Sequence, residues 1–267
     1  MTTGRATRTA LVIASVGIVA FIYLPIALIF VYAFNAGTTP SWPPVGFTLF
    51  WFGEAIRNTG LQQAFLTSLA VALCATIIAV VLGTLTSLAV SRYRFFGREA
   101  ISLVVIFPIA LPGIVTGMAL STTFSQVGIP LGFLTIVIGH ATFCIVLVYN
   151  NAIARLRRTS ASFEEASADL GADSWTTFRY ITFPNLRSAL LAGALLAFAL
   201  SFDEVIVTIF TAGGVKTLPI WIFQSFRLAN QVPVVNVAGV FAILLSVIPV
   251  YVATRLTSTS EVAGGRV

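Results

Sequence analysis

Six long apolar segments constrain this chain more than any other feature. They cover residues 11–34, 65–90, 101–120, 131–154, 188–211 and 237–254. Each is long enough to cross the hydrocarbon core of a bilayer, which takes about 20 helical residues. Only 9% of the 267 residues are charged and 58% are hydrophobic, whereas soluble domains carry about 25% charge. The sequence therefore predicts an all-α integral membrane protein with six transmembrane helices.

The basic residues predict the orientation of these helices. Twelve of the fifteen lie before the first segment, between the second and third, between the fourth and fifth, or after the sixth: Arg5, Arg8, Arg92, Arg94, Arg98, Arg155, Arg157, Arg158, Arg179, Arg187, Arg255 and Arg266. Loops rich in arginine and lysine stay on the cytoplasmic side of a membrane. We therefore expect both termini to be cytoplasmic, and we interpret the net charge of +6 as a topology signal rather than a nucleic-acid surface.

The sequence carries no pattern typical of an enzyme. The single lysine, Lys216, lies outside any glycine-rich phosphate loop. Cys74 and Cys144 fall inside apolar segments, which favours core packing over a disulfide or a metal site. His140 is alone within the fourth segment. It is expected to hydrogen-bond between helices, with a ligand or proton-relay role as the alternative. We predict no catalytic, cofactor-binding or metal-binding residues.

The most polar connection, residues 155–187, has the local signals of two short helices joined by a turn. These signals are a capping box (Ser162 with Glu165), a glycine stop (Gly171), a second cap (Asp173 or Ser174) and a proline in the first turn of the next segment (Pro184). The capping box predicts that the first helix starts at about Phe163. A short amphipathic helix should therefore project from the membrane and return to it.

The spacing in this connection resembles the EAA motif of ABC-importer permeases. It reads Glu165-Ala166-Ser167, three residues, Gly171, nine residues, Ile181, one residue, Phe183-Pro184, with Ser167 and Phe183 as mild departures. The resemblance implies a type I ABC importer permease fold, a single permease domain over residues 1–267, an accessory first helix at about 11–34, core helices at about 65–254 and a coupling loop at about 155–187. It also implies ATPase-coupling roles for Glu164, Glu165, Ala166, Ser167, Gly171, Ile181 and Pro184. Glu165 could pair with the ATPase, or could merely complete its cap.

Other stretches narrow the resemblance to the spermidine/putrescine-type permeases, and within them to the partner permease subunit. They include "FPIALPGIVTGMAL", "LLAFALSFDEVIVTIFTAG" and "TLPIWIF". The resemblance implies half of a heterodimeric pathway in the bacterial plasma (inner) membrane. Its partners would be a second permease, two copies of an ATPase that bind ATP and Mg, and an extracytoplasmic solute-binding protein. This chain would hold no cofactor and would contact the lipid bilayer and a small solute, but no nucleic acid.

The solute implied by the resemblance is a small cation of the polyamine class, spermidine or putrescine. Many polyamine permeases carry an acid directly after the second proline of the third segment, but Gly113 follows Pro112 here. Another small polar solute, such as an amino-acid-like compound, an opine or another amine, is therefore the alternative. A stand-alone secondary transporter is less favoured, because the sequence shows no internal repeat.

Two adjacent acids, Asp203 and Glu204, interrupt the fifth segment. Burying a charge at the centre of a bilayer costs at least about 2.5–3.5 kcal/mol, so neither acid should face lipid. On a continuous helix, Glu204 would share a stripe with Gly193 and Ala197 and bond to another helix, leaving Asp203 to face the pathway. If the stripe lined the pathway the roles would swap, and both acids could instead be buried hydrogen bonders.

The predicted solute pathway comprises Asp203, Glu204, Phe202, Pro112 and Trp221. Pro108 and Pro112 should bend the third segment. The bend is expected to be either a packing kink or a moving part of the pore.

Overall fold

The computed structural model describes residues 4–264, without the side chains of residues 5, 6, 229 and 256–264. Arg266, one of the charges used to predict orientation, lies outside the described residues, as does the side chain of Arg5. The described chain is helical, which confirms the predicted class. Its elements are α1 (Arg5–Ala33), α2 (Phe50–Arg57), α3 (Thr59–Arg92), α4 (Arg98–Ala110), α5 (Gly113–Gln126), α6 (Phe133–Arg158), α7 (Ser162–Asp169), α8 (Ser174–Thr177), the π-turn η1 (Phe178–Thr182), α9 (Phe183–Phe202), α10 (Ile206–Thr211), α11 (Leu218–Ser225), the short 3₁₀ turn η2 (Ala229–Gln231) and α12 (Val232–Gly264).

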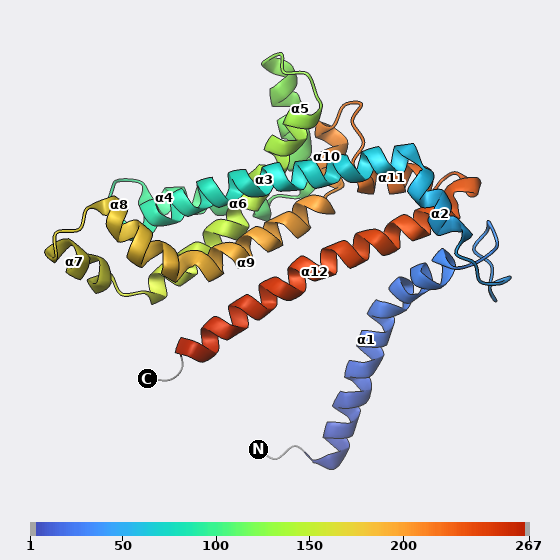
Figure 1. The fold of residues 1–267 in the computed structure, drawn as a ribbon, viewed down its shortest axis with the longest axis horizontal. Helices are drawn as coiled ribbons and strands as arrows, with labels where there is room; N and C mark the ends of the chain where they lie inside the picture. The colour runs from blue at the N-terminus through green and yellow to red at the C-terminus, as the bar shows by residue number, and fades with distance from the viewer. Residues whose placement is uncertain (1–3, 265–267) are drawn as a thin grey trace. The chain divides into compact units, whose positions relative to one another are not determined.

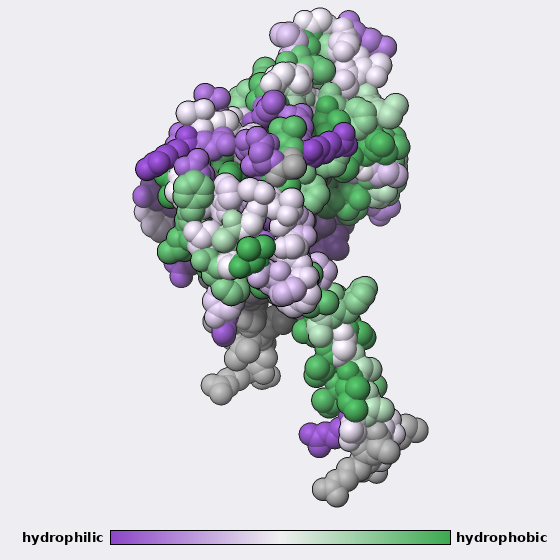
Figure 2. Space-filling view, turned by 90° about the vertical axis from the view of Figure 1, so that its right-hand side faces the viewer, coloured by the Kyte–Doolittle hydropathy of each residue, from purple (hydrophilic) through white to green (hydrophobic). Residues whose placement is uncertain are grey.

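The chain divides into two compact units, residues 1–62 with 222–243 and residues 63–221 with 244–267. In the first unit, most side chains of α1 are apolar, and the side of the helix visible in Figure 2 is mostly hydrophobic. Residues 7–25 of this helix are all exposed, among them Phe21 at 80% and Ile13 at 67%, whereas Ala33 at its end is buried. An apolar helix without an amphipathic face is typical of a membrane span, so lipid is the solvent that α1 fits.

The second unit is built around α6, which packs between α3 and α9 (Figure 1). Val148 of α6 is fully buried at the centre of this layer. A Cβ placed at Gly83 of α3 would lie 3.0 Å from Val148 Cβ, and one at Gly193 of α9 would lie 3.1 Å from Val148 Cα. The two glycines therefore allow both neighbouring helices to approach α6 closely, as small residues do in membrane bundles.

The predicted bend of the third segment is confirmed, whereas the prediction of one continuous helix through the fifth segment was wrong. The third divides into α4 and α5, which are bent by 107°. Leu111 is extended at the break because a residue before proline disfavours the helical region. The fifth divides into α9 and α10, with Asp203 ending α9 and residues 204–205 between them.

The other predicted segments match helices within a few residues at most ends. The largest differences at a start are in α1 and α3, which begin at Arg5 and Thr59 instead of residues 11 and 65. In α3 this start has a visible cause. Asn58 caps this helix by accepting a 2.9 Å hydrogen bond from Leu61 N–H. Within the described residues, five helices are long and apolar enough to cross a membrane, or six if the bent pair α4–α5 is one span.

The close approach at Val148 predicts a stability effect. Gly83→Leu or Gly193→Leu should push α3 or α9 away from α6 and destabilise the protein by about 1–3 kcal/mol, the usual cost of overpacking. Gly17→Leu is the matched control, because a Cβ at Gly17 of α1 meets nothing within 4 Å. Thermal unfolding of the purified protein in detergent measures the difference. Equal melting temperatures for all three variants would contradict the proposed packing.

Candidate functional site

Helix α7 ends at a glycine turn, as the sequence predicted. Gly171 has φ +86°, in the left-handed region that only glycine adopts easily. Its N–H donates to Ala168 O at 2.9 Å, and Ala172 N–H donates to Ser167 O at 3.1 Å. These two bonds form a Schellman motif, which satisfies the last carbonyl groups of the helix. Gly171 therefore defines where the chain turns back.

The predicted capping box at the start of α7 is wrong. Helix α7 already begins at Ser162, after Ala161, and no side chain caps it. Ser160 instead accepts a 3.2 Å hydrogen bond from Ser162 N–H, and the two hydroxyl groups lie 2.7 Å apart. The local serine–serine pair replaces the expected reach of Glu165 back to the helix start. The carboxylate of Glu165 is consequently exposed and not engaged in a cap.

The second short helix, α8, is capped by Asp173, one of the two predicted residues. Asp173 Oδ1 accepts a 2.8 Å hydrogen bond from Thr176 N–H. Hydrogen bonds from the Thr176 side chain and then its backbone lower the pKa of Asp173 below its ordinary value, so the cap is charged at neutral pH. The helical run then continues from Ser174 to Phe202 through the π-turn η1. Pro184 lies in the first turn of α9, directly after η1, where a proline removes one helical hydrogen bond.

The predicted coupling residues point in two directions. Glu164 and Ser167 turn toward the chain: Ser167 Oγ lies 3.0 Å from Thr177 Oγ1, and Glu164 contacts Arg92 and Thr182. Glu165, Ala166, Gly171 and Pro184 are exposed, and Ile181 is half-buried. The motif thus contains an inward and an outward set of residues rather than one contact surface.

The outward surface of α7 and α8 also contains exposed apolar side chains that were not predicted from the sequence. Phe163 is 59% exposed, Leu170 is 89% exposed and Trp175 is 64% exposed. Phe163, Ala166 and Leu170 are spaced by three and four residues, so they share one face of α7. This spacing is the sequence signal from which the apolar face could have been predicted. An exposed apolar face on a polar connection is typical of a protein-binding surface.

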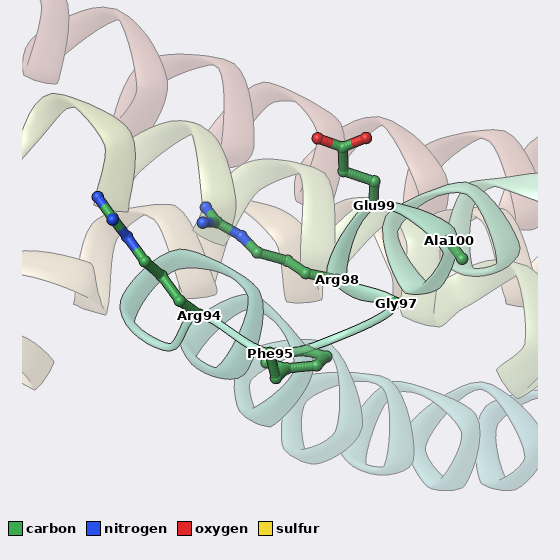
Figure 3. Close-up of a pocket in the computed structure, with 6 residues that line it drawn as sticks. All are labelled: Arg94, Phe95, Gly97, Arg98, Glu99 and Ala100. Atoms are coloured by element: carbon green, nitrogen blue, oxygen red, sulfur yellow. The ribbon is translucent and has the colours of Figure 1, made fainter.

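An arginine-lined cavity of about 560 Å³ lies at the turn between α3 and α4. In Figure 3, Arg94 and Arg98 extend to the same side of the turn, whereas Glu99 points elsewhere. Gly97 has φ +84° and makes the turn possible. This cavity and α7 lie toward the same end of the α3–α6–α9 layer, opposite α10 (Figure 1). Arg94 and Arg98 therefore lie toward the same end of this layer as α7.

The two acids lie at the break between α9 and α10, so their predicted positions on one helix are wrong. The stripe of Gly193 and Ala197 does pack against α6, but α9 ends before it reaches Glu204. Glu204 Oε1 accepts a 2.9 Å hydrogen bond from Val207 N–H, in the first turn of α10. Glu204 therefore stabilises its own chain at the break instead of bonding to another helix as predicted.

Asp203 is exposed, and no described side chain or backbone group bonds to its carboxylate. Together with Glu204 it lines an open groove of about 590 Å³. The other lining residues are Leu147, Leu196, Ala199, Leu200, Ser246 and Val250. The groove thus combines an apolar wall with a carboxylate that lacks a protein partner, an arrangement that suits a small organic cation.

His140 fixes the two sides of the break. It is 1% exposed, its Nδ1 lies 2.8 Å from Ser201 Oγ at the end of α9, and its Nε2 lies 2.8 Å from Thr208 Oγ1 in α10. Thr208 Oγ1 donates its own hydrogen to Glu204 O at 2.8 Å, so it accepts from His140 Nε2–H. The predicted role of His140 as a satisfied interhelical hydrogen bonder is confirmed.

The two helix breaks adjoin each other. A Cβ at Gly113 would lie 3.4 Å from Ile206 Cγ2, and one at Gly117 would lie 2.7 Å from Phe210 Cδ2. Pro112 is exposed at its break, close to α10. Phe202 and Trp221, also predicted in the pathway, are 2% and 7% exposed and belong to the packed interior of this chain.

Similarity to known proteins agrees with this architecture. Residues 79–259 match the family described as "Binding-protein-dependent transport system inner membrane component". The chain is 35% identical to the putrescine transport system permease protein PotI of Escherichia coli over 78% of this chain and 76% of PotI. It is 33% identical to the spermidine/putrescine transport system permease protein PotC of Escherichia coli over 92% of this chain and 93% of PotC.

A solved structure shares the fold at low sequence identity. It is the bacterial alginate ABC transporter in complex with an alginate pentasaccharide-bound periplasmic protein, with a TM-score of 0.71 and 13% identity over 94% of this chain and 93% of that chain. The helical architecture and the two sequence relatives both indicate an ABC transporter permease. The chain belongs to the binding-protein-dependent transport system inner membrane component family, and it is a multi-pass permease component of an ABC importer rather than an enzyme.

Proposed function

We propose that this chain forms half of the pathway by which an ABC importer carries a polyamine across the bacterial inner membrane. The observation that carries the proposal is Asp203, an exposed carboxylate without a protein partner in an apolar groove. The names of PotI and PotC, putrescine and spermidine/putrescine permeases, support a polyamine as the solute. Residues 1–267 would act as one permease domain, with α1 as an accessory helix, six spans and both termini cytoplasmic.

The chemistry of the groove supports a cationic solute. A carboxylate within a membrane span is costly unless it meets water, a donor or a cation. Glu204 already accepts a hydrogen bond from Val207 N–H, whereas Asp203 has no described partner. An ammonium group of a polyamine would supply both charge and hydrogen-bond donors to Asp203. The aliphatic part of the same solute would then lie along the apolar wall.

Gly113 supports the alternative of another small polar solute. It stands beside Ile206 at the start of α10, close to the break that carries the two acids. An acid at this position would add a second charge to the same region, and its absence weakens a site for a dication. A monoamine or a zwitterionic compound is therefore the second candidate.

The outward face of α7 supports coupling to a separate ATPase. Glu165 and Ala166 are exposed beside the apolar side chains of Phe163 and Leu170. We propose that this face docks on an ATPase subunit, that two such subunits bind ATP and Mg, and that a second permease and an extracytoplasmic solute-binding protein complete the importer. The chain itself would hold no cofactor.

Asp203→Asn tests the cation site. Uptake of labelled putrescine by cells that express the complete importer should fall about tenfold or more at low solute concentration, because a hydrogen bond to a charged group is lost. Asp203→Glu keeps the charge and should retain most of the uptake. Unchanged uptake in Asp203→Asn across putrescine concentrations would contradict this role, provided that both variants reach the membrane at equal levels.

Gly171→Ala tests the turn after α7. Alanine at φ +86° is strained by about 1–2 kcal/mol, so the turn should shift and misplace the docking face. Transport per ATP hydrolysed should fall. Gly97→Ala is the matched control, since Gly97 has φ +84° and both glycines have open space around them. If the two variants lost coupling equally, strain alone would explain the effect and the assigned role of Gly171 would be wrong.

A further inference from the structure

We propose that Glu164 is a positioning residue rather than part of the ATPase contact. With Arg92 and Thr182 it forms a cluster, here named the α3–α7 latch, that fixes α7 to the end of α3 and to the start of the helical run into α9. This inference rests on the proposed coupling role of α7. It separates Glu164 from its neighbour Glu165, although both belong to the motif that the sequence links to coupling.

The geometry of the latch joins three elements through one carboxylate. Glu164 Oε2 lies 2.9 Å from Arg92 Nε, at the last residue of α3. Glu164 Oε1 accepts a 2.9 Å hydrogen bond from Thr182 Oγ1, at the last residue of η1. Each carboxylate oxygen therefore has its own partner, and the two partners come from elements before and after α7 in the sequence.

The latch is sheltered from solvent. The side chains of Arg92 and Glu164 are 18% and 23% exposed, and Thr182 is 7% exposed. By contrast, a second ion pair, Arg57 with Glu54, has side chains 83% and 42% exposed. Water and salt screen exposed pairs strongly, and sheltered pairs much less. The contact at Glu164 is therefore the one expected to hold a fixed geometry.

Glu164 also compensates the positive charge of Arg92, whose guanidinium is partly buried. Arg92 Nε and Nη2 are both buried and neither makes a hydrogen bond among the described residues, so Glu164 meets Nε as an ion pair rather than through a hydrogen bond. Glu164 is the acidic side chain found beside this guanidinium. Removing one member of a sheltered pair is costly because it leaves the other charge uncompensated. The arginine and the glutamate thus depend on each other.

The latch connects α7 to α3, a helix distant from it in the sequence. Ser167 joins α7 to α8, which follows it directly in the chain. Glu164 instead joins α7 to α3. The end of α3 is in turn packed on α6 through Val90 and Tyr149, and the Tyr149 hydroxyl lies 2.8 Å from Ser102 Oγ of α4. A displacement of α7 would therefore act on α3, and through it on α6 and α4.

Hydrogen exchange on the full chain, purified alone in lipid nanodiscs, tests the latch without any partner. Glu164→Gln keeps the shape but removes the charge, and Thr182→Val removes the second partner. Both should speed exchange in peptides covering residues 162–171, by about tenfold for Glu164→Gln, within the range of coupling energies between contacting residues. Glu165→Gln is the matched control, because this exposed neighbour has no described contact, and its exchange should equal that of the wild type. Equal exchange in Glu164→Gln and Glu165→Gln would overturn the proposal.

The complete importer supplies the functional readout. Glu164→Gln should lower solute transported per ATP hydrolysed, and the charge reversal Arg92→Glu with Glu164→Arg should restore part of it, whereas Glu164→Arg alone should not. No restoration, together with unchanged exchange, would overturn the latch. If the wild-type importer showed no ATP-driven uptake, the proposed function would fail instead, and the exchange comparison would still decide the latch.

Discussion

The need to satisfy every backbone polar group inside lipid governs this structure. A helix does so within itself, and a break in a helix is tolerated only where side chains or neighbouring helices replace the lost bonds. The break between α9 and α10 meets this condition with local partners. Glu204 accepts from Val207 N–H, Thr208 donates to Glu204 O, and His140 holds Ser201 and Thr208 on the two sides. These contacts do not involve the Asp203 carboxylate, which is exposed and has no partner among the described residues.

The same constraint explains why two breaks lie together. Proline at 112 ends one helix and starts another, and Gly113 and Gly117 let α5 approach α10 closely. Irregular backbone at membrane depth is stable when it faces protein or a wet cavity rather than lipid. Two adjoining breaks cover each other's irregular backbone and create one region where a solute can meet polar groups. The groove lined by Asp203 opens at one of them.

At the opposite end of the second unit, two charged side chains of one motif lie in different environments. Glu164 and Glu165 are adjacent and chemically identical, yet α7 turns one toward Arg92 and the other outward. Neighbours on a helix are separated by about 100°, so one motif can serve both the interior and a docking face. This division explains how a short helix can be held firmly and still present a surface to a partner.

The sequence by itself determined the helical membrane class, the glycine stop at Gly171, a cap at Asp173 or Ser174 and the family, because apolar length, turn chemistry and motif spacing are local properties. It also placed His140 between helices, since a lone buried imidazole needs partners. It could not determine that α9 ends at Phe202, that Glu204 caps α10, or that Glu164 reaches Arg92. By hydropathy, "LSFDEVIVT" belongs to one apolar segment. No local signal in it distinguishes a continuous helix from a broken one. Only the tertiary structure decided these points, because the partners that make the break and the latch favourable come from distant parts of the chain.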